Sequence, residues 1–214
     1  MKPFNLVLAQ GCFVFELQHY RLYSEKIEGM LEQEVELLKE DHTSRVKCLN
    51  EKEREVFFDN RYDDYWELEN LFSVIQRKSI LISVYSVLEI NLNQLCRLYS
   101  KVIDSDIVLE DLGEKDNIKR AQIYLTKVAR VDFPLEHNSW TEIKKIQQIR
   151  NKLVHDNGNI PSGNSKLVRY IKNNTSLELD DSNRVVIRRG YIEHCISIFS
   201  DFFQELLNRN TPKK

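Results

Sequence analysis

The order of apolar and polar positions predicts a chain made mainly of helices. From residue 13 to residue 38 the apolar or neutral positions recur every three or four residues, as in a long helix that packs against another helix. These positions are Phe13, Leu17, Tyr20, Ser24, Ile27, Leu31 and Leu38. The polar residues 41–44 can break or restart a helix, and a weaker continuation toward Asn60 fits a helical hairpin or a bent helix.

The strongest helical pattern covers residues 62–103, which contain neither Gly nor Pro and are expected to form the central helix. Loops are predicted at 104–113 and 131–138, with a further helix at 114–130 between them. Ser139 and Glu142 have the spacing of a capping box, and Gly158 suits a helix C-terminus. They predict a capped helix over residues 140–156.

The last part of the chain predicts smaller elements. Residues 166–172 form a short helix, residues 177–179 and 185–187 flank a turn as a small β-hairpin, and residues 191–208 form an amphipathic helix. The predicted fold is therefore an all-α helical bundle with a long N-terminal helical arm and a small β-hairpin near residues 177–187. We divide it into an arm or hairpin, residues 1–60, packed on the core, and a helical domain, residues 61–214. The acidic arm is either a partner-binding or dimerisation surface, or a pair of helices that only packs on the core.

Composition supports this picture and adds a charge asymmetry. The 214 residues include 6 Gly and 4 Pro, too few for a sandwich or barrel with many turns. The formal net charge is −2, yet residues 139–214 hold 13 basic and 8 acidic side chains, so the C-terminal third suits an anionic ligand. Four scattered cysteines indicate neither a zinc site nor a disulfide framework. Without a sufficient signal-like or membrane-spanning apolar run, we expect a cytoplasmic protein without membrane association.

Common catalytic signatures are not found. The sequence has no glycine-rich phosphate loop, no GxSxG elbow and no HExxH helix, and its five histidines lie far apart. We therefore expect no cofactor and no metal.

One short string carries the candidate chemistry. Arg150-Asn151-Lys152-Leu153-Val154-His155 resembles the catalytic motif of HEPN (higher eukaryotes and prokaryotes nucleotide-binding) domains, in which His follows Arg after four to six residues and a polar residue, often Asn, comes directly after Arg. Residues 77–89, with Asn93 and Cys96, are similar to the long helix of HEPN proteins of abortive-infection and toxin systems. The resemblance covers about residues 62–209 and leaves the arm unexplained. Arg189 and His194 have the same spacing, but Gly190 follows that arginine at a helix start, so we treat this match as chance.

The resemblance implies a metal-independent endoribonuclease that acts as a homodimer, as a toxin or phage-defence effector, with RNA and an antitoxin or other regulatory protein as partners. In the implied transesterification, His155 is the general acid or base for attack of the RNA 2′-hydroxyl, Arg150 stabilises the pentacoordinate anion, and Asn151 orients phosphate or histidine. The alternative is a non-catalytic HEPN-like module that binds RNA or nucleotide, or a protein-interaction scaffold.

The helical geometry of the motif sets a second expectation. Arg150 falls near the middle of an apolar arc, so it needs a carboxylate, an anionic ligand or a facing subunit. Glu89 on the central helix is the candidate carboxylate, with Asn93 one turn later as a supporting residue. Arg150 lies about 140° from His155 on an ideal helix, so convergence requires unwinding at the helix end or a second protomer. A basic cluster is either an RNA-binding surface or a solvated face; it comprises Lys144, Lys145, Lys152, Lys166, Arg169 and Lys172.

Overall fold

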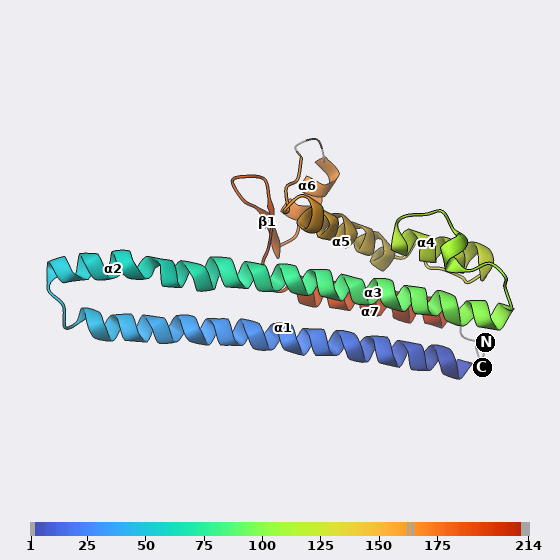
Figure 1. Cartoon of the computed structure of the whole chain (residues 1–214), viewed down its shortest axis with the longest axis horizontal. Coiled ribbons are helices and arrows are strands. Elements are labelled where there is room, and N and C mark those ends of the chain that lie inside the picture. The colour runs from blue at the N-terminus through green and yellow to red at the C-terminus, as the bar shows by residue number, and fades with distance from the viewer. Residues whose placement is uncertain (1–2, 162, 164, 211–214) are drawn as a thin grey trace.

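The computed structural model describes residues 3–161, 163 and 165–210 and confirms the all-α fold with a small hairpin (Figure 1). Its helices and strands follow in this order: α1 (Pro3–Val46), α2 (Glu51–Trp66), the π-helical η1 (Glu67–Phe72), α3 (Ser73–Ile103), the 3-10 turn η2 (Leu109–Asp111), α4 (Asn117–Ile123), the π-helical η3 (Tyr124–Val128), α5 (Asn138–His155), α6 (Ser165–Lys172), β1 (Leu177–Leu179), β2 (Val185–Ile187) and α7 (Tyr191–Asn210). Strands β1 and β2 pair antiparallel, with Glu178 opposite Val186.

A long helical hairpin forms the frame of the molecule. Helix α1, 44 residues and therefore about 66 Å long, runs antiparallel to the rod formed by α2, η1 and α3 (Figure 1). The rod begins at a capping box, in which the backbone N–H of Asn50 donates to Glu53 and the N–H of Glu53 donates to the Asn50 side chain. The boundary between residues 60 and 61 falls inside α2, so the arm and the central helix share one continuous rod.

The helical hairpin is confirmed, but its turn follows residues 41–44 and does not include them, because α1 continues to Val46 and α2 begins at Glu51. The hydroxyls of Thr43 and Ser44 donate to the carbonyls of Lys39 and Glu40 one turn earlier, so these polar side chains are satisfied within the helix. Arg45 adds an ion pair to Asp41 at i, i+4.

The core lies where α3 meets α1, α5 and α7. The inner face of α1 contributes Phe13 and Leu17, and the Phe13 ring lies 4.0 Å from that of Phe203 on α7. The three-and-four spacing that we saw in the arm therefore packs against helices of the same chain.

Helix α3 belongs to the only described segment, Asp64–Ile103, that is long and apolar enough to cross a membrane by length and composition. This differs from our expectation that no stretch approaches a membrane span, since the polar residues of this stretch are mostly uncharged. Its buried residues pack on α1, α5 and α7, so the apolar character matches the position of α3 at the centre of the bundle.

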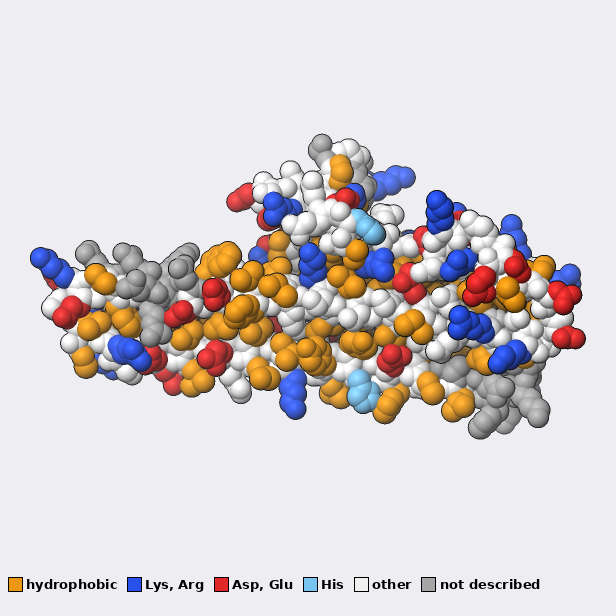
Figure 2. Space-filling view, viewed as in Figure 1, with side chains coloured by type: hydrophobic (Ala, Val, Ile, Leu, Met, Phe, Trp, Pro, Cys, Tyr) orange, Lys and Arg blue, Asp and Glu red, His pale blue; other side chains and the backbone are white. Residues whose placement is uncertain are grey.

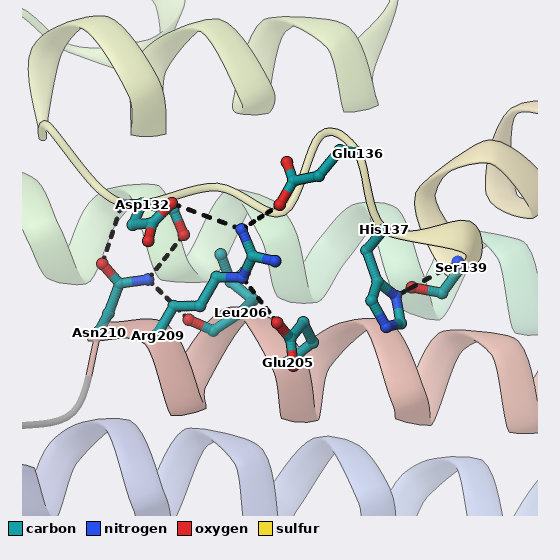
Figure 3. A network of polar contacts seen from close by, with 8 residues as sticks. All are labelled: Asp132, Glu136, His137, Ser139, Glu205, Leu206, Arg209 and Asn210. Carbon is teal, nitrogen blue, oxygen red and sulfur yellow. Dashed lines mark hydrogen bonds and ion pairs between the residues drawn. The ribbon is translucent and has the colours of Figure 1, made fainter. Parts of the chain in front are cut away.

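Helix α5 is capped at its start by His137, so the prediction of Ser139 as the cap residue is wrong. The Nδ1 atom of His137 accepts from the backbone N–H of Ser139 and lies 2.7 Å from its Oγ (Figure 3). Ser139 is itself helical and buried, which leaves it facing the core and not the free N–H groups. At the other end Gly158, with φ +82°, donates its N–H to the Lys152 carbonyl and confirms the predicted stop.

A buried ion pair joins the two arms of the hairpin. Nε and Nη2 of Arg77 on α3 donate to the two carboxylate oxygens of Glu28 on α1 at 2.6 and 2.7 Å. The side chains are only 11% and 8% exposed, so removing one partner leaves a buried, unpaired charge.

We predict that Arg77→Met lowers the free energy of unfolding by about 3–5 kcal/mol, the usual effect of breaking a buried pair. Urea unfolding followed by circular dichroism measures the loss. The double variant Arg77→Met/Glu28→Leu should regain most of it, because no charge is left unpaired. Lys39→Ala, in the exposed pair with Glu36, is the control and should change little. A double variant no more stable than Arg77→Met would contradict this account.

Candidate functional site

The loop before α5 is tied to the end of α7, which fixes where α5 begins (Figure 3). Arg209 of α7 contacts Glu205 at 2.6 Å, Glu136 at 2.5 Å and Asp132 at 3.6 Å. The side chain of Asn210 donates to the Asp132 carbonyl and accepts from its N–H. These contacts hold the start of the motif helix against α7.

Arg150 lies on the side of α5 that faces α3, and the predicted pairing with Glu89 is confirmed. Its Nη2 is 3.5 Å from Oε2 of Glu89, and the two side chains are 21% and 15% exposed. The guanidinium carbon is 5.0 Å from the centre of the buried Tyr85 ring, a cation–π geometry. Nη1 donates to Oδ1 of Asn151 at 2.9 Å.

The guanidinium of Arg150 is incompletely satisfied. Its Nε is buried and has no hydrogen-bond partner among the described residues. The 3.5 Å contact to Glu89 is longer than a well-formed hydrogen bond between charged groups. Arg150 therefore keeps N–H donors free, while part of its side chain reaches solvent.

A polar shell from α4 surrounds Glu89. The Asn117 side chain donates to Oε1 of Glu89 at 3.4 Å, and Gln147, one turn before Arg150, donates to Asp116 at 2.7 Å. Asp116 also caps α4. Burial raises the pKa of the Glu89 carboxyl, and the nearby Arg150 charge opposes this shift in part. The site is thus clamped between α3, α4 and α5.

Asn151 and His155 lie about 100° and about 140° around α5 from Arg150. Spaced four residues apart, they share a face with Lys144, and His155 is exposed at the last position of the helix. The side chain of His155 has no hydrogen bond or ion pair within the part of the chain that the structure describes. The structure therefore brings Arg150 to Asn151 and Glu89, and it does not bring His155 to Arg150.

The predicted supporting residue Asn93 lies one turn after Glu89 on α3, and no hydrogen bond joins its side chain to Arg150 or Glu89 among the described residues. Its side-chain oxygen is buried without a hydrogen-bond partner among the described residues. Sequence reasoning missed Tyr85, Asp116, Asn117 and Gln147. Gln147 and Tyr85 left a signal, since each lies one turn before a predicted site residue, Arg150 and Glu89. Asp116 and Asn117 left none, because they come from a segment distant in sequence from both.

The basic cluster is spread over α5 and α6. Lys152 forms a 2.6 Å ion pair with Asp156, so its charge is compensated. The other five form no ion pair within residues 3–161, 163 and 165–210, and all of these but the half-buried Lys145 are exposed: Lys144, Lys145, Lys166, Arg169 and Lys172.

The second arginine–histidine spacing does not form a site. Arg189 contacts Glu32 on α1. His194 lies 3.8 Å from Glu142, whose carboxylate also accepts from the Tyr170 hydroxyl at 2.9 Å. The two residues are thus engaged with different helices.

Comparisons with family models, with curated proteins and with solved structures give no match for this chain. Within the described residues there is no group of three or more His, Cys, Asp or Glu that could hold a metal ion.

We predict that the free energy of unfolding of Glu89→Gln increases relative to that of the wild type as pH rises from about 4 to about 7. Because the folded state raises the pKa of Glu89 above its ordinary 4.5, the protonated carboxyl favours folding, and this contribution is lost as pH rises through the raised value. Gln cannot ionise and keeps its contribution. Thermal unfolding at the two pH values measures the difference.

In an Arg150→Met background the pH effect of Glu89→Gln should grow, since the opposing guanidinium charge is gone. A wild type that gains stability over Glu89→Gln with rising pH would show instead that the Arg150 attraction outweighs burial.

Proposed function

We propose that this chain is a cytoplasmic, metal-independent endoribonuclease of the HEPN type, with Arg150 as the residue that binds the scissile phosphate. The observation that carries the proposal is the unsatisfied guanidinium of Arg150, placed in an otherwise apolar helix face. A structural arginine in the same bundle, Arg77, has both carboxylate contacts at 2.7 Å or less. Arg150 therefore has N–H donors left to bind an anion, whereas the Nε and Nη2 donors of Arg77 are taken up by Glu28.

The phosphate site is completed by a second copy of the chain. Unwinding the end of α5 to swing His155 toward Arg150 is disfavoured, because the N–H groups of Asp156 and Gly158 both donate to the Lys152 carbonyl, at 3.0 and 2.8 Å. Lys78 also holds Asn157 at 3.2 Å. Two α5 helices facing each other across a two-fold axis bring His155 of one copy toward Arg150 of the other without disturbing these bonds.

In the reaction, the RNA 2′-oxygen attacks the adjacent phosphorus while the bond from phosphorus to the 5′-oxygen breaks. His155 takes the proton of the 2′-hydroxyl or gives a proton to the departing 5′-oxygen. The free N–H groups of Arg150 bind the oxygens of the pentacoordinate anion, and Asn151 holds the guanidinium in place. The uncompensated charges of Lys144, Lys145, Lys166, Arg169 and Lys172 attract the RNA backbone.

A second candidate is a non-catalytic module that binds RNA or nucleotide, or a scaffold. The observation in its favour is the contact of Arg150 with Glu89 and Tyr85, which also suits an arginine that only fastens α5 to α3. Such a protein binds RNA or a partner without cleaving RNA. An antitoxin or another regulatory protein is a further partner under either candidate.

We predict that Arg150→Ala lowers RNA cleavage by about 10²–10³-fold and His155→Ala by about 10²–10⁴-fold, the usual loss of a transition-state donor and of a general acid or base. Arg189→Ala and His194→Ala, which match the motif spacing, are the controls and should keep wild-type rates. Cleavage of a labelled RNA at equal protein concentration measures all four, with circular dichroism to show that each is folded. Full activity in His155→Ala would show that His155 only terminates α5 and takes no part in catalysis.

If Arg150 and His155 of different copies form each site, mixing the two inactive variants should restore about a quarter of the wild-type activity. Half of the randomly mixed dimers then hold one variant of each kind, and each of these has one intact site of two. No recovery after subunit exchange would place both residues of a site in one chain or show that neither acts on RNA.

Cleavage should persist in EDTA and leave a 2′,3′-cyclic phosphate and a 5′-hydroxyl, since His155 and Arg150 supply the proton transfer and the charge stabilisation. Mass spectrometry of a short RNA substrate identifies both ends. Activity that is lost in EDTA, or that leaves a 5′-phosphate, would indicate a metal-dependent nuclease.

A further inference from the structure

Helix α1 has a second apolar face, which is largely exposed in the described part of the chain. Six large apolar side chains on it are each more than half exposed, between 53% and 68%. We call them the outer stripe: Leu8, Phe15, Leu22, Tyr23, Met30 and Leu37.

The outer stripe lies roughly opposite the inner face of α1. At about 100° per residue, its members fall within about 60° of one line along the helix, while Phe13, Leu17 and Val35 fall on the far side. Between them along that line are four exposed residues, of which only Lys26 is a lysine, arginine or acidic residue: Cys12, His19, Lys26 and Gln33. The 4-3 spacing of this line is that of a coiled-coil seam.

The apolar surface continues sideways onto the neighbouring rod. Figure 2 shows hydrophobic side chains along α1 and along the seam between α1 and α3. A groove at this seam is lined by Tyr23 and Ile27 of α1, by Phe72, and by Ile75 of α3. The outer stripe and this groove form one patch.

We propose that the outer stripe pairs in antiparallel orientation with the outer stripe of a second copy, across a two-fold axis between Leu22 and Tyr23. The spacing of the stripe is symmetric about this point. In the pair, Leu8 lies opposite Leu37 of the second copy, Phe15 opposite Met30, and Leu22 opposite Tyr23, so that each of the six side chains meets another of the six. An isologous dimer requires such a self-complementary surface.

The charges of α1 select the antiparallel orientation. Residues 25–41 carry seven acidic side chains and two basic ones, whereas residues 3–24 carry only Glu16 and Arg21. A parallel pair places the two acidic halves side by side, with repulsion between like charges. In the antiparallel pair each acidic half faces a nearly uncharged half, and Lys26 lies within one turn of Glu16 of the second copy.

The size of the contact suits a dimer that depends on concentration. The stripe spans about 45 Å of a helix about 10 Å wide, so pairing buries roughly 900 Å² in total. Side chains at the groove, such as Phe72 and Ile75, bring the total to the roughly 1,000 Å² that a specific interface needs.

This interface is separate from the facing α5 helices of the proposed function. Figure 1 shows α5 on the opposite side of α3 from α1. The α1 pair is thus tested by mass and by cross-linking, without reference to RNA cleavage. Loss of the pair in an α1 variant, in a protein that cleaves no RNA, would support the α1 interface and reject the proposed function.

Light scattering over a dilution series provides the first test. The wild type should reach at least the dimer mass of about 51 kDa, and Leu22→Glu should halve the mass because two glutamates then meet at the two-fold axis. Val14→Glu is the matched control: Val14 is on the same helix and 41% exposed but lies off the stripe, so its mass should equal that of the wild type. A wild type that stays monomeric, or a Leu22→Glu variant with unchanged mass, would overturn the proposal.

Cysteine cross-linking tests the orientation. In a Cys12→Ser/Cys48→Ser background, which removes the exposed native thiols, Leu22→Cys should form a covalent dimer with a short bis-maleimide, because the two copies of residue 22 flank the axis. Leu8→Cys should not, because the two copies of residue 8 lie at opposite ends, about 43 Å apart along the helix axis. Cross-linking at both positions would indicate a parallel pair, and cross-linking at neither would indicate no pair; each result contradicts the antiparallel interface.

Discussion

The burial of arginine in apolar helix faces is the constraint on which the rest of this molecule depends. A guanidinium removed from water needs several partners at once. Helix α3 takes part in two such ion pairs, one fully hydrogen-bonded and the other not. Arg77 of α3 is matched by both oxygens of Glu28, which fastens α1 to the rod. Glu89 of α3 approaches Arg150 only to 3.5 Å and is shared with Asn117. The first pair is saturated, while the second leaves Nε of Arg150 without a hydrogen-bond partner among the described residues.

Much of the fold could be predicted because apolar periodicity and turn residues act locally. The hairpin strands and Gly158 lie where the sequence places them, and Glu89 meets Arg150 because both are charges on apolar faces of helices that must pack. The errors in the predicted helix boundaries occur where a polar side chain can either cap a helix end or hydrogen-bond within the helix. Thr43 and Ser44 satisfy the preceding carbonyls and continue α1, and His137 takes the cap position that Ser139 was expected to fill.

The shell around Arg150 was beyond sequence reasoning for a different reason. Asp116 and Asn117 reach the site only because α4 packs on α3 at that level, and no periodicity in either segment encodes this meeting. The separation of His155 from Arg150, in contrast, follows directly from helical geometry. The structure adds that the end of α5 is fastened by two bonds to the Lys152 carbonyl. This makes approach from another chain the less costly route to a combined site.

The two faces of α1 show why its periodicity was only half understood from the sequence. Apolar residues that recur on opposite sides of a helix cancel in any single measure of amphipathicity, so the sequence predicted only the inner apolar face of α1. Once the inner face is occupied by α3 and α7, the outer stripe has no partner in the described chain. Its two-fold axis and that of facing α5 helices lie on opposite sides of α3. Two such distinct two-fold contacts close into a tetramer if their axes intersect at right angles and into a larger dihedral particle at about 60° or 45°, whereas axes that do not intersect extend the chains into an open array. The relative orientation of the two axes therefore decides whether the proposed α1 and α5 contacts can occur in one closed particle.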